Sequence, residues 1–171
     1  ASISTQLIPD GPTPTAAVID LVTGDERHRL KRDALRSSFD YHVRTSKRFS
    51  YLHGLGDLFD ATGSPREPSW EDHSFRMIQI PSIFFGEGLK KGSVKLDWLD
   101  DGKIVGTLED SKENGELIIT NCANTSEVGK FVGLIFYWEG FILLTNFSSI
   151  YDKDGVEIAN TTWRDFMTDL D

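Results

Sequence analysis

The stretch "GLIFYWEGFILLTNF" at residues 133–147 decides the fold class. It consists of two apolar runs that meet at Glu139-Gly140, where the glycine supplies the positive φ that hairpin turns require. We therefore expect two antiparallel strands. A strand of a small β domain usually alternates apolar and polar residues, because one face packs on the core and the other meets water. Here both faces are apolar, so both need a cover.

Each strand of this hairpin divides its side chains between two faces. The first strand sets Leu134, Phe136 and Trp138 against Ile135 and Tyr137, and the second sets Phe141, Leu143 and Thr145 against Ile142, Leu144 and Asn146. One face is expected to pack in the chain's own core. The other face is expected to meet either a helix at residues 24–52 or a neighbouring subunit. Burial of each such side chain is worth about 1.5–3 kcal/mol, so we expect Trp138 and its neighbours to be covered.

The same β character extends over residues 75–150. Short β-prone runs are separated there by turns rich in Gly, Asn and Asp. The runs are "FRMIQI", "GSVKLDWL", "KIVGTLE", "GELIIT", "KFVGLIFYW" and "FILLTNFSS". Asp101-Gly102 predicts a second tight hairpin. The chain is therefore predicted to be mainly β, with an antiparallel sandwich or a small barrel at residues 75–150.

The chain before this module is expected to be an extended arm followed by a helix. Prolines in residues 1–22 favour extended backbone, and a floppy terminus and a partner-binding arm remain open alternatives. Residues 23–56 are predicted to be helical, beginning at a Thr23-x-x-Glu26 capping box. The apolar stripe on this helix is Leu30, Ala34, Leu35, Phe39, Val43, Phe49 and Leu52. Polar residues between Ser37 and Thr45 make a break there possible.

Two further segments complete the expected organisation. Residues 57–74 are predicted to form a loop, because Gly63, Pro65 and Pro68 rule out a regular element. Residues 151–171 are predicted to form a tail with a short amphipathic helix, on which Trp163, Phe166 and Leu170 follow at i, i+3 and i+7. This helix is a candidate docking peg.

Composition and charge restrict the function classes. Hydrophobic content of 39% and charged content of 26% are those of a globular protein, and no apolar run reaches the length of a membrane span. The net charge is −9, and residues 49–171 hold ten basic against 21 acidic residues. Residues 26–48 hold eight basic residues against three acidic ones. We expect this basic segment to be solvated or to dock on an acidic protein, with nucleic acid an unlikely partner.

The sequence carries no recognisable arrangement for chemistry. The four histidines lack the spacing of zinc ligands, and Cys122 is expected to be a buried structural thiol. The run Asp152-x-Asp154-Gly155 lacks the later ligands of a calcium loop and is interpreted as a turn. No nucleotide-binding or nucleophile motif is present. We expect a protein that is not an enzyme and has no catalytic residues, no metal and no cofactor.

Three segments, in order and spacing, resemble a module of tailed-bacteriophage virion structural proteins. They are "IQIPSIFFGEGLKKGSVKLDW" (78–98), "GTLEDSKENGELIIT" (106–120) and "VGLIFYWEGFILLT" (132–145). In that module a strand with an I-P-S-I-F-F-G core leads to a K-K-G-S-V-K-L strand, a turn and a hairpin. The resemblance implies a β-rich component of a tail, baseplate, neck or fibre, built from many copies and without catalytic residues.

The expected function is therefore structural. The chain would assemble in the host cytoplasm into a virion, in contact with other virion proteins or copies of itself, and without a membrane. A carbohydrate-binding β domain of a receptor-binding or fibre protein is the alternative, in which Trp70, Trp98, Trp138 or Trp163 stacks on sugar rings. A small hydrolase with dispersed carboxylates is the third reading. The candidate interface residues are Phe136, Trp138, Phe141, Leu143, Phe39, Val43, Trp163 and Phe166.

Overall fold

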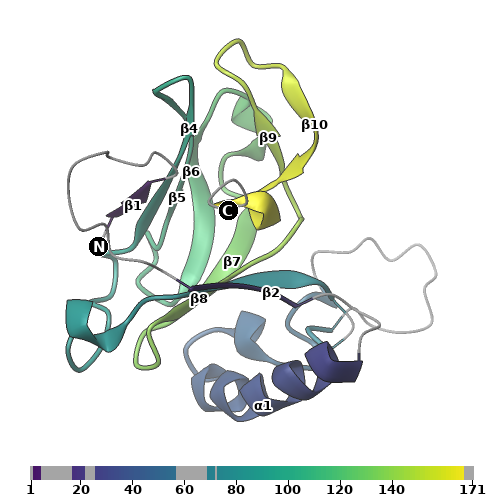
Figure 1. Cartoon of the computed structure of the whole chain (residues 1–171), viewed down its shortest axis with the longest axis vertical. Coiled ribbons are helices and arrows are strands. Elements are labelled where there is room, and N and C mark those ends of the chain that lie inside the picture. The colour runs from purple at the N-terminus through teal and green to yellow at the C-terminus, as the bar shows by residue number, and fades with distance from the viewer. Residues whose placement is uncertain (1, 5–16, 22–25, 57–68, 72, 168–171) are drawn as a thin grey trace. The chain divides into compact units, whose positions relative to one another are not determined.

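The computed structural model describes residues 2–4, 17–21, 26–56, 69–71 and 73–167. Within these residues the chain is mainly β, with a curled antiparallel sheet, a small two-stranded sheet and one α-helix (Figure 1). The chain divides into two compact units. Asp20–Phe75 forms one unit, and Ala1–Ile19 together with Arg76–Asp171 forms the other.

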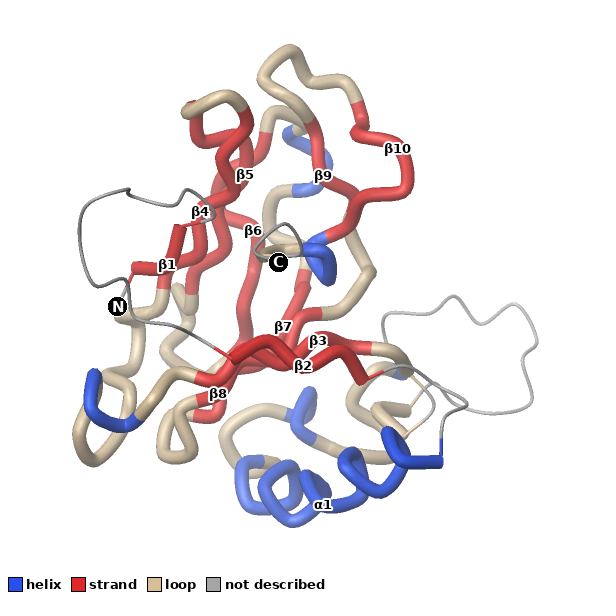
Figure 2. The backbone as a smooth tube through the Cα atoms, viewed as in Figure 1, coloured by secondary structure: helices blue, strands red, loops and turns tan. Residues whose placement is uncertain are grey.

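Six antiparallel strands make up the main sheet, and Figure 2 shows them as red segments. In spatial order they are β4 (Lys95–Asp100), β5 (Lys103–Glu109), β6 (Glu116–Cys122), β7 (Phe131–Phe136), β8 (Phe141–Leu144) and β3 (Phe75–Gln79). Two strands from the N-terminal part extend its edges: β1 (Ser2–Ser4), parallel to β4, and β2 (Ala17–Leu21), beside β3. A separate antiparallel pair comprises β9 (Ser149–Tyr151) and β10 (Glu157–Thr162).

The hairpin between β4 and β5 confirms the turn predicted at Asp101-Gly102. Asp100 pairs with Lys103 across a two-residue loop. Asp101 and Gly102 both have positive φ, 48° and 74°, which is the geometry of the hairpin turn that follows the twist of the strands. Turn chemistry therefore sets the register beside the turn, and an irregularity between Trp98 and Leu99 shifts the register of the remaining pairs.

The β7–β8 hairpin differs from its prediction at the turn. Its strands end at Phe136 and begin again at Phe141, and Gly140, with φ of 71°, closes a four-residue loop by donating its N–H to the Phe136 carbonyl oxygen at 2.9 Å. Trp138 therefore lies in the turn, where it is 64% exposed. The expectation that Trp138 continues a covered strand face is wrong, because the loop contains two more residues than predicted.

Both faces of β7 and β8 are nevertheless buried within the chain, as the apolar pattern requires. Every residue of the two strands is buried. Ile135 and Ile142, which face each other across the ladder, belong to the main apolar cluster. Phe136 and Phe141 also face each other, and their rings stack with centroids 4.3 Å apart. The hairpin is thus a central element of the sheet.

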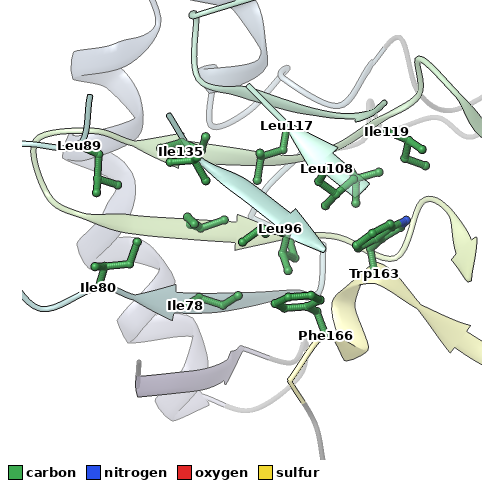
Figure 3. Packing of buried hydrophobic residues seen from close by; sticks show 14 of the residues in the cluster. Ile78, Ile80, Leu89, Leu96, Leu108, Leu117, Ile119, Ile135, Trp163 and Phe166 are labelled. Atoms are coloured by element: carbon green, nitrogen blue, oxygen red, sulfur yellow. The ribbon is translucent and has the colours of Figure 1, made fainter. Parts of the chain in front are cut away.

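The apolar cluster of the β unit draws on every strand of the curled sheet (Figure 3). Its members include Ile78, Leu96, Leu108, Leu117, Ile119, Ile135, Ile142, Trp163 and Phe166. The segment after β10 contributes two large rings to it. Trp163 begins a single 3₁₀ turn, Trp163–Asp165, and both Trp163 and Phe166 are buried. The predicted C-terminal amphipathic helix is wrong within the described residues, because Phe166 already has an extended ψ of 127°. Leu170 lies outside them.

The unit Asp20–Phe75 contains the helix α1 (Glu26–His42) and a 3₁₀ turn, Lys47–Phe49. The helix ends at His42, ten residues before the predicted limit of 52, within the range between Ser37 and Thr45 where a break was considered possible. Phe49 is still buried, but it reaches the interior from the 3₁₀ turn. Val43 and Leu52, which the predicted stripe placed with it, are exposed. The capping box at Thr23 lies outside the described residues.

Aromatic rings form the interior of this unit. Phe39 lies 5.4 Å from Tyr51 and 5.3 Å from Trp70 between ring centroids, and Trp70 lies 5.8 Å from Phe75. The Trp70 Nε1 donates to the Arg48 carbonyl oxygen at 2.8 Å. Trp70 belongs to the segment predicted as a loop. The Pro and Gly pattern of that segment did not indicate that its tryptophan would be buried in the interior.

Candidate interaction surface

One end of the curled sheet is formed by a loop that wraps around the β7–β8 turn. The loop follows β3, and two hydrogen bonds attach it: the Ile80 N–H donates to the Gly140 carbonyl oxygen and the Leu89 N–H to that of Tyr137, both at 2.8 Å. The Phe85 ring covers Gly140 so closely that a Cβ there would lie 2.2 Å from it. This contact requires glycine at position 140.

Large apolar side chains of this loop and turn point into solvent. Ile83 is 86% exposed, Phe84 56% and Trp138 64%. Gly88 brings the two segments together, because a Cβ on it would lie 3.3 Å from the Trp138 ring. We call Ile83, Phe84 and Trp138 the apolar tip. Scattered exposed apolar residues are ordinary, but a group of large ones on adjoining segments is a candidate interaction site.

The backbone of the tip explains why its side chains face outward. The "IPSIFFG" run was expected to be a strand, but β3 ends at Gln79 and Ser82–Phe84 form a 3₁₀ turn. Such a turn does not alternate its side chains between two faces. Pro81 begins it and Gly86, with φ of 68°, follows it. These turn-forming residues on both sides of the apolar run were the sequence signal that the strand prediction missed.

A buried carboxylate holds the β7–β8 turn from inside. Asp110 is 1% exposed, and its oxygens accept hydrogen bonds from the Gly92 N–H at 2.9 Å and the Gly115 N–H at 3.1 Å. The Tyr137 hydroxyl donates to the same carboxylate. Hydrogen bonds to an ionised acceptor are about twice as strong as neutral ones. Asp110 therefore fixes three separate loops at one point.

These three loops are the ones that the resemblance singled out. Gly92 lies in the "KKGS" segment, Asp110 and Gly115 begin and end the turn between β5 and β6, and Tyr137 begins the "YWEG" turn. Burial, together with the hydrogen bond to Asp110 and the charge of that residue, raises the pKa of Tyr137. The phenol is thus held as a protonated donor beneath Trp138.

The wrapping loop also carries charged side chains. Glu87, Lys90 and Lys91 are exposed on the wrapping loop. The Lys91 Nζ lies 5.8 Å from the centroid of the Tyr137 ring, which places this cation beside the β7–β8 turn. The surface therefore combines an apolar centre with side chains of both signs, an arrangement typical of protein interfaces.

The structure separates the candidate interface residues into buried and exposed ones. Six are buried within the chain: Phe39, Phe136, Phe141, Leu143, Trp163 and Phe166. These six stabilise the fold and do not belong to its surface, which corrects their expected role. Val43 is 40% exposed beyond the end of α1, and Trp138 belongs to the apolar tip. Ile83 and Phe84 complete the tip and were not among the candidates.

The four tryptophans are not equally available for stacking on a sugar. Trp70 and Trp163 are buried. Trp98 is half-buried, with its ring 5.8 Å from both Trp163 and Phe166. Trp138 alone among the four is exposed. A sugar-binding reading therefore depends on the same turn as the apolar tip.

Glu127 and Cys122 are further buried groups of the β unit, and their surroundings give each a structural role. Glu127 accepts hydrogen bonds from the Lys130 Nζ at 2.7 Å and from the Ser148 hydroxyl. Burial opposes the ionisation of Glu127, but these hydrogen bonds and the Lys130 charge lower its pKa. Burial raises the pKa of the Cys122 thiol, which disfavours the reactive thiolate.

The predicted turn at residues 152–155 is confirmed. The Asp152 side chain accepts hydrogen bonds from the N–H groups of Asp154 and Val156, at 2.8 and 2.9 Å. Among the residues that the structure describes, no three His, Cys, Asp or Glu side chains come together as metal ligands. No helix in the described part of the chain is long and apolar enough to cross a membrane.

Comparison with known proteins returned no relative. The chain matches no protein-family model, no curated protein and no solved structure.

Proposed function

We propose that this chain is a structural component of a tailed-phage virion, which docks on other virion proteins or on copies of itself through the apolar tip. One observation carries the proposal. The segments that resemble the virion module meet around Asp110, and two of them expose Ile83, Phe84 and Trp138 at one end of the sheet. A buried anchor beneath an exposed apolar surface is the arrangement of a rigid docking site.

Rigidity gives this arrangement an advantage for assembly. A loop that is ordered only on binding loses conformational entropy at that step, whereas a loop already held loses little. Two backbone hydrogen bonds and the Asp110 carboxylate hold the wrapping loop and the turn before any partner arrives. The exposed rings then supply apolar area that is removed from water on docking.

The fold itself is proposed to be barrel-like. Ile78 of β3 and Leu96 of β4 belong to one apolar cluster, although these strands stand at opposite ends of the six-stranded order. A sheet whose two end strands contribute to one interior is curled towards closure. Methyl-labelled protein should show a continuous network of nuclear Overhauser contacts from Ile78 to Leu96. A network interrupted between these strands would argue for an open sheet.

The proposed function is tested on particles. Tailed particles purified from the source of this sequence should contain the chain by mass spectrometry, and it should remain after washing in high salt. A double variant, Ile83→Ser with Trp138→Ser, should fold but be lost from the particles. Val156→Ser is the matched control, because Val156 is 61% exposed on the β9–β10 turn and should not affect incorporation. Particles that lack the wild-type chain would contradict the proposal.

A carbohydrate-binding domain is the second candidate, and the exposure of Trp138 is the observation that favours it. An aromatic ring on a rigid turn can stack on the apolar face of a sugar. Ile83 and Phe84 lie on the adjoining loop and offer no polar group for sugar hydroxyls. A glycan array read with the wild-type chain and Trp138→Ser decides between the two. Binding that depends on Trp138 would replace docking as the role of the tip.

A further inference from the structure

We propose that the partner of the apolar tip is a second copy of this chain, related to the first by a twofold axis. The two tips then pack against each other. This inference rests on the proposed function, because it names the partner of the same surface.

The charges beside the tip have the self-complementarity that a twofold interface needs. In such an interface the same patch meets itself, so an acidic group on one side must face a basic group on the other. Glu87 adjoins Gly88, which lies against the Trp138 ring, and Lys90 and Lys91 follow on the same loop. A twofold axis through the tip sets this loop against the same loop of the second copy, so Glu87 of one copy can pair with Lys90 or Lys91 of the other.

The charge of the wrapping loop differs from that of residues 49–171 as a whole. The chain carries a net charge of −9, and residues 49–171 hold ten basic against 21 acidic residues. Two such surfaces repel each other. The wrapping loop, residues 80–91, instead holds one acidic and two basic residues. Approach through the tip therefore avoids the repulsion between the acidic surfaces of residues 49–171.

The exposed area sets the strength of the contact. From the exposed fractions of Ile83, Phe84 and Trp138, the tip presents an apolar area of about 400 Å² per copy, half of the roughly 800 Å² that each partner buries in a standard interface. The dimer should therefore be weak and concentration-dependent in solution. In an assembly of many copies, the same contact gains strength because its partners are held near one another.

Sedimentation velocity of the full chain measures this association. Between about 10 µM and about 1 mM protein, the weight-average sedimentation coefficient should rise from the monomer towards the dimer value. Ile83→Ser with Trp138→Ser should weaken association at least tenfold, and Val156→Ser should leave it unchanged. Wild-type protein that stays monomeric throughout this range, or a double variant that associates equally well, would overturn the inference.

Charge-reversal variants test the twofold geometry separately from non-specific hydrophobic association. Glu87→Lys makes the flanking charges of the tip all basic, and Lys90→Glu with Lys91→Glu makes them all acidic. Each variant alone should be monomeric, because like charges then meet. An equimolar mixture should associate at least as strongly as the wild type. A mixture no stronger than either variant alone would overturn the twofold arrangement.

Vesicles distinguish a second copy from a lipid surface. Wild-type protein should remain in solution with vesicles of phosphatidylcholine and phosphatidylglycerol. Monomeric protein that sediments with them through Trp138 would overturn the inference in favour of lipid. Failure of the inference is separable from failure of the proposed function. If the chain is monomeric but present in particles, only the dimer inference is rejected. If the chain is a dimer but absent from particles, only the proposed virion function is rejected.

Discussion

Replacement of Asp110 by asparagine should destabilise the β unit without changing the size of the side chain. One carboxylate oxygen accepts from the Gly92 N–H and the Tyr137 hydroxyl, and the other accepts from the Gly115 N–H. Asparagine keeps a single acceptor oxygen. Its NH₂ group must face either the Gly92 N–H or the Gly115 N–H, and neither of these can accept a hydrogen bond.

The magnitude follows from the better of the two asparagine orientations. That orientation keeps the Gly92 and Tyr137 contacts and leaves the Gly115 N–H against another donor. A hydrogen bond to a charged group contributes about 1.5–3 kcal/mol, and a buried unpaired donor costs about 1–3 kcal/mol. The two remaining bonds also become neutral and therefore weaker. We expect the free energy of unfolding to fall by about 3 kcal/mol.

Urea denaturation followed by circular dichroism measures this loss. With a slope of about 2 kcal/mol per molar urea, the midpoint should fall by about 1.5 M for Asp110→Asn. Tyr137→Phe, which removes one of three donors, should lower it by a smaller amount. Asp154→Asn is the matched control on an exposed turn and should change the free energy by less than about 0.5 kcal/mol. An Asp110→Asn midpoint equal to that of the control would refute the anchoring role of the carboxylate.

Three other predictions concern pH and packing. The pKa of Tyr137 is raised, so the contribution of the protonated hydroxyl to stability is complete below its ordinary pKa of 10 and is lost as the pH rises further. The free energy of unfolding measured above pH 10 should therefore fall less steeply with pH in Tyr137→Phe than in the wild type. Equal slopes would contradict this prediction. The pKa of Glu127 is lowered, so the contribution of its carboxylate to stability is present above pH 4.5 and is lost as the pH falls below that value. The free energy of unfolding of Glu127→Gln should therefore depend less on pH in the acid range than that of the wild type. An unchanged pH dependence would contradict this prediction. Trp163→Ala should cost about 3–5 kcal/mol in thermal unfolding, because Trp163 is buried against Gly106, and a loss below about 1 kcal/mol would show that the ring is dispensable.

Local patterns were sufficient where turn chemistry decides the backbone. The Asp101-Gly102 hairpin was predicted to the residue, because two adjacent positions of positive φ determine it. The β7–β8 turn was also located, but its length was not. Tyr137 leaves the strand pattern to donate to Asp110, which lies 27 residues earlier. A contact at that separation has no signature in the apolar periodicity.

Periodicity was misleading where an apolar side chain reaches the interior from an irregular segment. Phe49 continues the helical stripe in sequence, yet it packs from a 3₁₀ turn that Ser46 caps with a hydrogen bond from the Arg48 N–H. Trp163 and Phe166 suggested a docking helix, yet their rings fill the apolar cluster of the sheet. The spacing of apolar residues in the sequence indicates that these side chains are buried. It does not show whether they belong to a helix, a strand or an irregular segment.

The contacts that hold the tip also determine when it can form during folding. Ile80 and Gly140, which one hydrogen bond joins, lie near opposite ends of the sheet segment of the chain, so their meeting depends on closure of a long loop. The tip should therefore appear late, after the β4–β5 and β5–β6 hairpins. Pulse-labelled hydrogen exchange should show the Ile80 and Leu89 amides, which donate to Gly140 and Tyr137, protected later than those of β5. If the chain docks through the tip as proposed, docking would then have to wait until the β unit is folded.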